Sequence, residues 1–269
     1  MKTALTIAGS DSSGGAGIQA DIKTFSALGV FGMSAITAIT AQNTCGVLNV
    51  WELDEAIVQD QIDAVFNDIP VHAVKIGMLC NAAIVNVVAE ALKRHKPSNI
   101  VVDPVMVSKN GRPLLQPDAA EKLIELIFPL ADVVTPNLPE AARITGLSIE
   151  DRKDMEKAAR RILALGPKHV VIKGGHLLGQ PYDLLFDGQR FIEYRQNRID
   201  TVHTHGTGCT FASAIAASLA QGMTMRAAVD RAKNYVTTAI RHGFALGKGI
   251  GPTHHFYELY EKAGLPLEG

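Results

Sequence analysis

The segment that decides the fold is ALTIAGSDSSGGAGIQA, residues 4–20, in which a short apolar run meets a cluster of glycines and then an amphipathic stretch. Residues 4–10 are mostly apolar without strict alternation, which is typical of a strand buried on both faces. The glycines allow a tight turn, and helical periodicity covers residues 15–28. This order predicts a strand, a turn and a helix, which together begin a βα-repeating sheet.

The same alternation continues through the next 150 residues or so, as short β-branched runs separated by longer stretches with helical periodicity. The predicted strands cover residues 4–10, 33–42, 73–79, 99–106, 131–137 and 169–175. The predicted helices cover residues 15–28, 54–67, 82–95, 118–128, 139–145 and 154–165. Strands that are apolar on both faces belong to parallel sheets covered by helices on each side, so the pattern predicts an α/β fold with a mainly parallel sheet.

Beyond residue 175 the pattern changes. Two short strand-like pieces, residues 182–187 and 190–194, flank Gly188 and predict a small hairpin at the sheet edge. No linker, repeat or low-complexity tract interrupts the chain, so residues 1–269 are expected to form a single domain. The remaining predicted helices cover residues 206–221, 225–241 and about 255–262.

Composition excludes several classes of function. Lys and Arg total 26 against 27 Asp and Glu, a net charge of −1, so the chain lacks the broad positive field that nucleic-acid binding needs. No run of about 18 apolar residues is present, which argues against a membrane span. Three cysteines without a CxxC pair argue against a disulfide framework and a structural zinc site, and favour the cytoplasm.

The strongest local signal for chemistry is HGTGCT, residues 205–210, at the start of an alanine-rich helix. The first N–H groups of such a helix are unsatisfied and its dipole is positive at this end, so the position suits a phosphate. We expect the same groups to lower the pKa of the Cys209 thiol from about 8.5 toward neutrality, so that it could take a proton. The alternative is that Cys209 is simply a small residue capping the helix.

The glycine-rich loop of residues 9–17 is ambiguous by itself. It lacks the Lys and Ser/Thr of a Walker A loop and contains no GxGxxG, so it either makes a tight turn or faces a ligand. Asp21, in the first two turns of the following helix, either accepts hydrogen bonds from a polar ligand or is a solvated surface residue. Lys248, in GKGIG, is either a lysine of a mobile lid or a solvated loop residue.

Oxygen ligands follow two neighbouring strands. Asp103 ends one predicted strand, and Asn137 and Glu140 follow the next, in TPNLPE. Carboxylate and amide oxygens suit a hydrated Mg²⁺, although each residue could instead cap a helix or a turn. Lys173 ends another strand beside Gly174, where it either contacts a phosphate or is an ordinary surface lysine.

Five separated motifs occur in order along the chain: residues 4–21, KIGM at 75–78, TPNLPE at 135–140, KGGH at 173–176 and HGTGC at 205–209. Together they resemble the bacterial hydroxymethylpyrimidine/phosphomethylpyrimidine kinases of thiamine biosynthesis, which belong to the ribokinase-like superfamily. The likeness spans nearly the whole chain and includes GKGIGP at residues 247–252.

The resemblance implies a ribokinase-like three-layer α/β/α fold, a homodimer, and two successive phosphorylations of 4-amino-5-hydroxymethyl-2-methylpyrimidine that require ATP and Mg²⁺. It also implies roles for individual residues. Gln42 would read the amino and ring-nitrogen edge of the pyrimidine, because an amide both donates and accepts. The other implied pocket residues are Gly9, Asp21, Met78 and Val105; the implied catalytic residues are Cys209 as base with Gly206, Gly208 and Lys173; the implied nucleotide contacts are Asn137, Lys173, Thr207 and Lys248; and the implied metal ligands are Asp103 and Glu140.

Three alternative functions remain open on the sequence. A pyridoxal kinase of the same branch would phosphorylate a related heteroaromatic alcohol, with Gln42 and Met78 setting the pocket, and one enzyme could serve both substrates. A cysteine-dependent acyl- or thiol-transfer enzyme would use Cys209 with an orienting histidine such as His205. A non-catalytic vitamin-binding protein would release no ADP.

Overall fold

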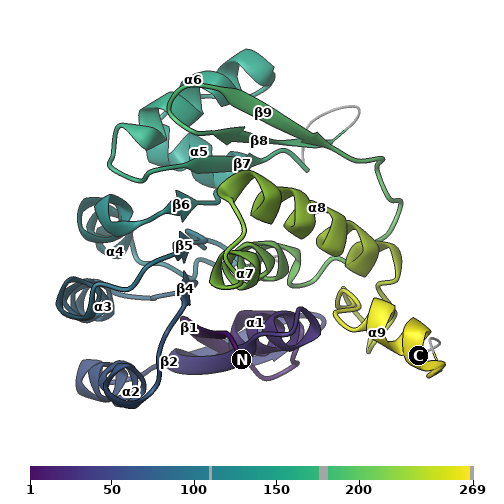
Figure 1. Cartoon of the computed structure of the whole chain (residues 1–269), viewed down its shortest axis with the longest axis horizontal. Coiled ribbons are helices and arrows are strands. Elements are labelled where there is room, and N and C mark those ends of the chain that lie inside the picture. The colour runs from purple at the N-terminus through teal and green to yellow at the C-terminus, as the bar shows by residue number, and fades with distance from the viewer. Residues whose placement is uncertain (109–110, 176–180, 267–269) are drawn as a thin grey trace.

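One nine-stranded sheet forms the centre of the part of the chain that the structure describes, residues 1–108, 111–175 and 181–266 (Figure 1). In this computed structural model the strand order is β3-β2-β1-β4-β5-β6-β7-β8-β9. Strands β1, β2 and β4 to β7 run parallel, whereas β3, β8 and β9 are antiparallel to their neighbours. The mainly parallel sheet and the edge hairpin β8–β9 are therefore confirmed. The strands are β1 Thr3–Asp11, β2 Phe31–Asn43, β3 Gly46–Glu52, β4 Ala73–Ile76, β5 Ile100–Val102, β6 Val133–Val134, β7 Val170–Lys173, β8 Tyr182–Phe186 and β9 Phe191–Arg195.

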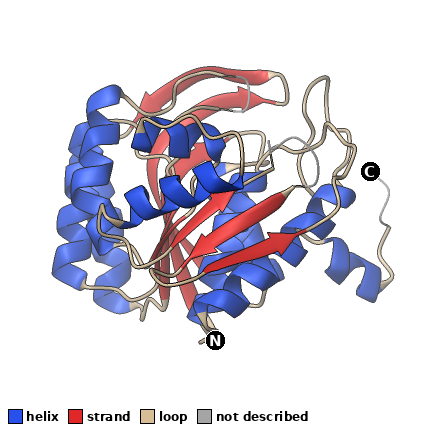
Figure 2. Ribbon diagram, turned by 90° about the horizontal axis from the view of Figure 1, so that it is seen from above, coloured by secondary structure: helices blue, strands red, loops and turns tan. Residues whose placement is uncertain are grey.

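Helices cover both faces of this sheet, which confirms the three-layer arrangement (Figures 1 and 2). Helices α2, α3, α4 and α6 bury apolar side chains against one face, and α1, α7 and α8 bury theirs against the other. The helices are α1 Gly17–Ala27, α2 Glu55–Asp68, α3 Ala82–His95, α4 Pro117–Lys122, α5 Leu138–Thr145, α6 Arg152–Leu163, α7 Thr207–Ala220, α8 Met225–Arg241 and α9 Tyr257–Ala263. A π turn, Leu123–Ile127, and a 3₁₀ turn, Phe128–Leu130, extend α4.

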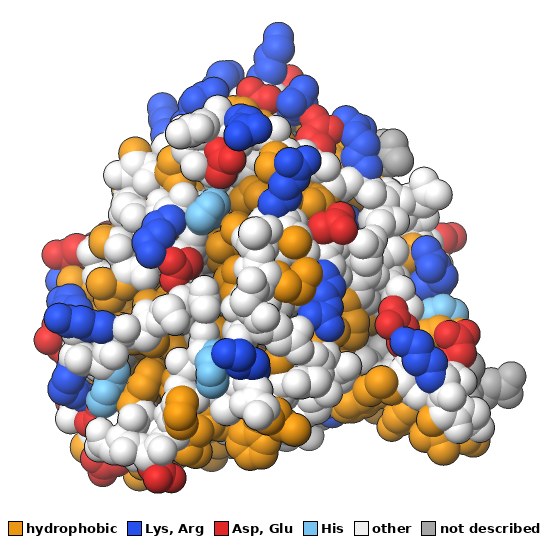
Figure 3. Space-filling model, viewed as in Figure 1, with side chains coloured by type: hydrophobic (Ala, Val, Ile, Leu, Met, Phe, Trp, Pro, Cys, Tyr) orange, Lys and Arg blue, Asp and Glu red, His pale blue; other side chains and the backbone are white. Residues whose placement is uncertain are grey.

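Helix α6 shows how the outer layers form. Its buried residues, Met155, Ala158, Ala159 and Ile162, recur at helical spacing and face the sheet. The Lys and Arg side chains between them are exposed and gather at the top of the face seen in Figure 3. Lys, Arg, Asp and Glu are otherwise interspersed on that face.

The sequence misses strand β3 and overestimates the lengths of β4 to β7; β4 ends at Ile76 rather than at residue 79, and β7 ends at Lys173 rather than at residue 175. All residues of β3 are exposed or half-buried, so the strand carries no alternating apolar pattern. Residues 99–106 and 131–137 were both expected to be strands, but β5 ends at Val102 and β6 at Val134. Pro104 and Pro136 follow these ends, and a residue without an N–H cannot continue the ladder.

The parallel strands end at one edge of the sheet, so the residues that follow β1, β4, β5, β6 and β7 converge there. Residue 17 forms an isolated bridge with Ser10, and His205 forms one with Pro252, which draws the glycine-rich loop and the start of α7 to the same edge. Among the described residues, no helix is long and apolar enough to cross a membrane.

Candidate active site

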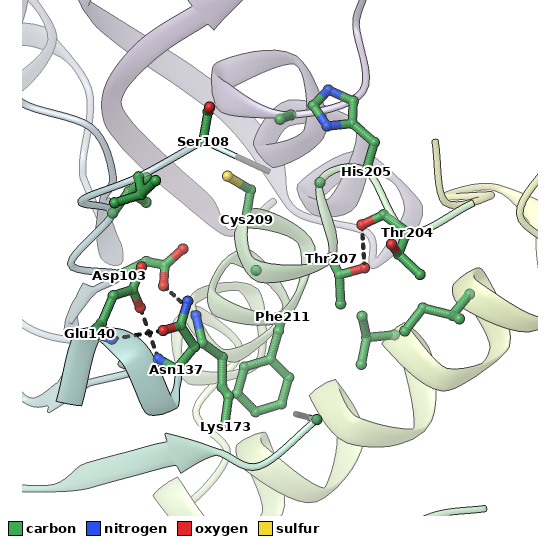
Figure 4. A pocket seen from close by; sticks show the side chains of 18 of the residues that line it. Asp103, Ser108, Asn137, Glu140, Lys173, Thr204, His205, Thr207, Cys209 and Phe211 are labelled. Carbon is green, nitrogen blue, oxygen red and sulfur yellow. Dashed lines mark hydrogen bonds and ion pairs between the residues drawn. The ribbon is translucent and has the colours of Figure 1, made fainter. Parts of the chain in front are cut away.

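A cavity of about 770 Å³ opens at the carboxyl ends of the parallel strands, against the N-terminus of α7 (Figure 4). Its position follows the general rule for ligand sites in α/β sheets. Two predicted site residues, Asp21 and Lys248, are not among the residues that line it. The predicted residues that do line it are Gly9, Gln42, Met78, Asp103, Val105, Asn137, Glu140, Lys173, Gly206, Thr207, Gly208 and Cys209.

The start of α7 packs directly on the glycine-rich loop. Gly206, the N-cap, has φ +81°, and a Cβ there would lie 1.8 Å from the Gly15 carbonyl oxygen. The first bond inside the helix runs from the Thr210 N–H to the Gly206 carbonyl at 2.9 Å. The N–H groups of Gly208 and Cys209 come before it and point out of the helix, which is the geometry of an anion site.

The Cys209 side chain lines the cavity beside this turn (Figure 4). The sequence predicts a lowered pKa for its thiol, and that prediction is wrong. Burial raises the pKa of Cys209 to about 11, and the Asp21 carboxylate adds to the rise while the Lys75 ammonium opposes it. Loss of water around the thiolate therefore outweighs the helix dipole and the nearby N–H groups.

Asp103 and Lys173 form an ion pair at the entrance to α7. Lys173 Nζ donates to Asp103 Oδ1 at 2.6 Å, and the Asp103 side chain is almost fully buried. Burial disfavours the Lys173 ammonium, but Asp103 and then Glu140 outweigh it and raise the pKa of Lys173. A Cβ at Gly208 would lie 3.4 Å from both Asp103 Oδ2 and Lys173 Nζ, so glycine leaves these groups room beside the helix.

Asn137 and Glu140 cap α5 and line the cavity at the same time. The Asn137 side chain accepts from the Glu140 N–H at 2.9 Å, and the Asn137 N–H donates to Glu140 Oε2 at 2.8 Å, which forms a capping box. Burial raises the pKa of Glu140 to about 7; Lys173 opposes the rise, and Asp103 adds to it. Glu140 therefore exchanges its proton near neutrality.

The carboxylates of Asp103 and Glu140 suit Mg²⁺ better than they suit a metal ion whose ligands all come from the protein. No group of three or more His, Cys, Asp or Glu side chains able to hold a metal occurs among residues 1–108, 111–175 and 181–266. Mg²⁺ is commonly held by one or two carboxylates, with phosphate oxygens and waters completing its coordination. Asp103 and Glu140 provide that number of ligands next to the anion site.

Asp21 lies beneath the cavity and has a structural role. Its oxygens accept from Thr6 Oγ1 at 2.6 Å, Ser213 Oγ at 2.6 Å and Lys75 Nζ at 2.9 Å, and it is fully buried. The expectation that Asp21 bonds the ligand is therefore corrected, because three protein donors already use its carboxylate. Lys75, which the sequence analysis leaves without a role, lines the cavity in its place.

Another part of the cavity is lined by apolar side chains. Met78 and Val105 line it, and a Cβ at Gly9 would lie 2.3 Å from Met78 Cε, so the end of the methionine packs closely on the Gly9 backbone. The Gln42 side chain lies nearby, with its Nε2 atom 3.2 Å from His205 Nε2. An apolar slot with one amide at its edge suits a flat heteroaromatic ring.

Sequence reasoning also missed polar residues of this cavity. Asp11 and His205 pair at 2.8 Å, and Lys233 and Asp183 pair at 2.8 Å. All four line the cavity. No local motif marks Lys233 or Asp183, which lie inside α8 and in strand β8, whereas His205 sits within the motif that was singled out.

Lys248 is exposed, as both the lid and the solvated-loop alternatives allow. Its segment is held by the Gly249 N–H to Thr44 Oγ1 at 3.1 Å and the Ile250 N–H to the Thr44 carbonyl at 2.9 Å. His176, the last residue of the KGGH motif, lies outside the described residues.

Solved structures share this fold over nearly the whole chain. Pyridoxal kinase of Bacillus subtilis, in an ADP complex, has a TM-score of 0.88 and 42% identity, covering 95% of this chain and 97% of that one. Phosphomethylpyrimidine kinase of Clostridium difficile has a TM-score of 0.81 and 51% identity, covering 89% of this chain and 100% of that one. The fold and the site thus define a kinase of the ribokinase-like class.

Sequence comparison identifies the family to which the chain belongs within this class. A family model described as phosphomethylpyrimidine kinase matches residues 11–254, and the chain belongs to that family. The hydroxymethylpyrimidine/phosphomethylpyrimidine kinase of Streptomyces coelicolor is 52% identical over 257 residues, 96% of this chain and 95% of that protein. The bifunctional protein ThiED of Geobacter sulfurreducens is 54% identical over 252 residues, 93% of this chain, and the chain spans only 51% of that relative. Membership disfavours both a cysteine-dependent transferase and a non-catalytic binding protein.

Proposed function

We propose that this chain phosphorylates the hydroxymethyl group of 4-amino-5-hydroxymethyl-2-methylpyrimidine and then phosphorylates the monophosphate to the diphosphate, in thiamine biosynthesis. The observation that supports this most is one cavity that joins an anion site at the α7 N-terminus to an apolar slot edged by Gln42. ATP is the phosphate donor, in keeping with the ADP complex of the Bacillus subtilis relative. We expect the chain to act as a single domain.

Phosphoryl transfer depends mainly on alignment and on neutralising charge that spreads over the phosphate oxygens. The N–H groups of Gly206, Gly208 and Cys209 would hold the transferring phosphate. Lys173 would approach it from the side, because its ammonium lies beside Gly208. Asn137 and Thr207 would contact the nucleotide.

Mg²⁺ would be held by Asp103 and Glu140. When bound, it would neutralise charge on the phosphates of the nucleotide. Because burial raises the pKa of Glu140 to about 7, this residue must lose a proton to bind the metal. Metal affinity should therefore rise with pH through neutrality.

Cys209 is the candidate acceptor for the hydroxyl proton in the first reaction. With its pKa raised to about 11, little thiolate is present at pH 7, so a base function requires the rate to rise with pH over several units. In the second reaction the acceptor is a phosphate that is already largely ionised, so it needs little base. A positioning role for Cys209 would leave both rates nearly independent of thiol ionisation.

Pyridoxal is the second candidate substrate, since pyridoxal kinases of Bacillus subtilis and Staphylococcus aureus share this fold at TM-scores of 0.88. Both substrates are flat heteroaromatic rings with a hydroxymethyl group. The difference lies at the ring edge, where an aminopyrimidine offers an amino donor beside a ring-nitrogen acceptor. The Gln42 amide matches that pair, which favours the pyrimidine.

A homodimer in the cytoplasm is part of this proposal. Edge strand β3 exposes Leu48 at 71% and Trp51 at 73%, and Ile39, paired with Trp51, is 49% exposed. Apolar side chains of this size on an edge strand are typical of a protein–protein contact. Sedimentation velocity tests this: wild type should sediment as a dimer and Trp51→Lys as a smaller species.

Cys45, Cys80 and Cys209 form no disulfides, which suits a reducing compartment.

The experiment is a comparison of kcat/KM for hydroxymethylpyrimidine and pyridoxal, with ADP release measured in separate reactions under Mg·ATP. We expect the pyrimidine to be preferred, and Gln42→Ala to reduce kcat/KM for the pyrimidine far more than for pyridoxal. ADP release with pyridoxal alone would move the chain to the second candidate, and release with neither would refute the proposal.

A further inference from the structure

Asp11, at the end of β1, is a fixed anion at the base of the substrate pocket. It is 3% exposed and accepts from Ser13 Oγ at 2.7 Å and from the N–H groups of Ser13 and Ala16 at 2.9 and 2.8 Å. Burial opposes its ionisation, but His205 and Ser13 outweigh that effect and lower the pKa of Asp11 to about 2. Asp11 therefore only accepts hydrogen bonds throughout the physiological range.

This anion determines which ring nitrogen of His205 faces it as a donor. His205 Nε2 lies 2.8 Å from Asp11 Oδ2, and because a carboxylate can only accept, Nε2 must carry a proton. The ring packs against the glycine-rich loop, since a Cβ at Gly15 would come within 2.3 Å of its Cδ2 atom. Its backbone is held as well, by hydrogen bonds with Gly251 and Thr253. His205 thus presents a fixed N–H to its surroundings.

The same Nε2 atom lies 3.2 Å from the end of the Gln42 side chain. With the amide nitrogen on that side, two donors would face each other. The Nε2 hydrogen is already donated to Asp11 at 2.8 Å, but a half-turn of the amide puts its oxygen there instead, where it shares that hydrogen as the longer arm of a three-centre bond. His205 therefore selects one of the two orientations of the Gln42 amide.

The other end of the amide requires the same orientation. It lies 3.2 Å from Thr40 Oγ1, whose single hydroxyl hydrogen is donated to the Ser10 carbonyl at the shorter distance of 2.9 Å. Thr40 Oγ1 can then only accept from Gln42, so the amide nitrogen belongs on this side. Two independent neighbours thus agree on the direction of the amide.

We propose that Asp11 and His205 are positioning residues that hold the Gln42 amide with its oxygen toward the α7 N-terminus and its nitrogen toward Thr40. The pocket then selects a heteroaromatic edge that carries an amino donor on the α7 side and a ring-nitrogen acceptor on the Thr40 side. This inference rests on the proposed function, in which Gln42 pairs with the substrate ring.

The orientation also determines which way the reacting group points. In the aminopyrimidine the hydroxymethyl carbon is attached to C5, next to the amino-bearing C4 and away from N3. An amino group paired with the Gln42 oxygen on the α7 side places the hydroxymethyl group on that side too, toward Cys209. The reverse orientation would turn it toward Thr40, away from the anion site.

The test compares the substrate with its 4-oxo analogue, whose edge has the opposite order of acceptor and donor. Discrimination is the ratio of kcat/KM for the 4-amino compound to that for the 4-oxo compound. In His205→Phe only Thr40 still favours this orientation and the amide can turn more readily, so discrimination should fall by about tenfold, because mispaired buried polar groups penalise the analogue less. His205→Gln keeps an N–H at the same distance along the side chain and should retain most of the discrimination.

Two further variants test whether the loss of discrimination acts through the Gln42 amide. Thr40→Val frees the other end of the amide and should also lower discrimination, which tests the inference even if His205→Phe fails to fold. In a Gln42→Ala background, His205→Phe should change discrimination no further. Wild-type discrimination in an active His205→Phe or Thr40→Val variant, or an equal loss in the Gln42→Ala background, would overturn the inference. Wild-type protein that phosphorylates neither compound would instead refute the proposed function on which the inference rests.

Discussion

Replacing Lys75 by Met should destabilise the protein by several kcal/mol through Asp21 rather than through lost packing. The Lys75 and Asp21 side chains are both 0% exposed, and their charged atoms are 2.9 Å apart. Removing one member of such a buried pair leaves an uncompensated charge, which costs about 3–5 kcal/mol. Methionine keeps most of the volume of the lysine stem, so the cavity contribution is small.

Protonation of the Asp21 carboxylate would set an upper limit to the free energy of unfolding that Lys75→Met loses. A carboxyl group with the ordinary pKa near 3.9 becomes neutral at pH 7 at a cost of about 1.36 × (7 − 3.9), or about 4 kcal/mol. At pH 5 the same step costs only about 1.5 kcal/mol. In the variant the folded state binds a proton that the unfolded state releases, so its stability should fall as pH rises from 5 to 7.

Urea unfolding at pH 5 and pH 7, without nucleotide or metal, measures both effects. We expect the free energy of unfolding of Lys75→Met to fall by about 4 kcal/mol relative to wild type at pH 7, and by clearly less at pH 5. The matched control is the double variant Lys75→Met/Asp21→Asn, which removes the charge and should recover most of the loss. A loss below about 1 kcal/mol at pH 7, or one independent of pH, would refute this reasoning.

The site supports three further predictions. Cys209→Ala should slow the first phosphorylation more than the second, as measured by mass spectrometry of the products. In wild type, log kcat of the first reaction should rise with pH toward about 10. Equal losses in both reactions would leave Cys209 only a positioning role. Glu140→Gln should raise the melting temperature of the metal-free protein at pH 8 more than at pH 5. The raised pKa of Glu140 makes the wild-type folded state lose stability as pH rises through 7, whereas glutamine stays neutral and keeps the capping box. The same change in melting temperature at both pH values would argue against that pKa. Gly206→Ala should weaken ATP binding by tenfold or more in calorimetry, because its Cβ would lie 1.8 Å from the Gly15 carbonyl oxygen, and full affinity in this variant would contradict the described approach.

Much of the fold and the outline of the site could be predicted because parallel strands impose a geometry on the sequence. Buried strands are apolar on both faces, and their carboxyl ends meet at one edge, so Asp103, Asn137 and Lys173 could be brought together from position alone. The edge strand β3 could not be predicted, because an exposed strand needs no apolar pattern.

Interactions between charged groups that are distant in sequence could not be predicted from local sequence. Asp21 looks like a ligand-facing carboxylate until Thr6, Ser213 and Lys75, from three other elements, are seen to use its oxygens. The pKa of Cys209 rises because burial dominates, and burial depends on the whole fold. His205 lies within a conspicuous motif, yet its partner Asp11 is 194 residues away in sequence.

The most direct test of the account is a mass-spectrometric time course of the purified protein with Mg·ATP and hydroxymethylpyrimidine. The monophosphate should accumulate first and then decline as the diphosphate appears, with one ADP released at each step. A reaction that stops at the monophosphate, or a protein that phosphorylates only pyridoxal, would contradict the claim that one cavity carries out both transfers.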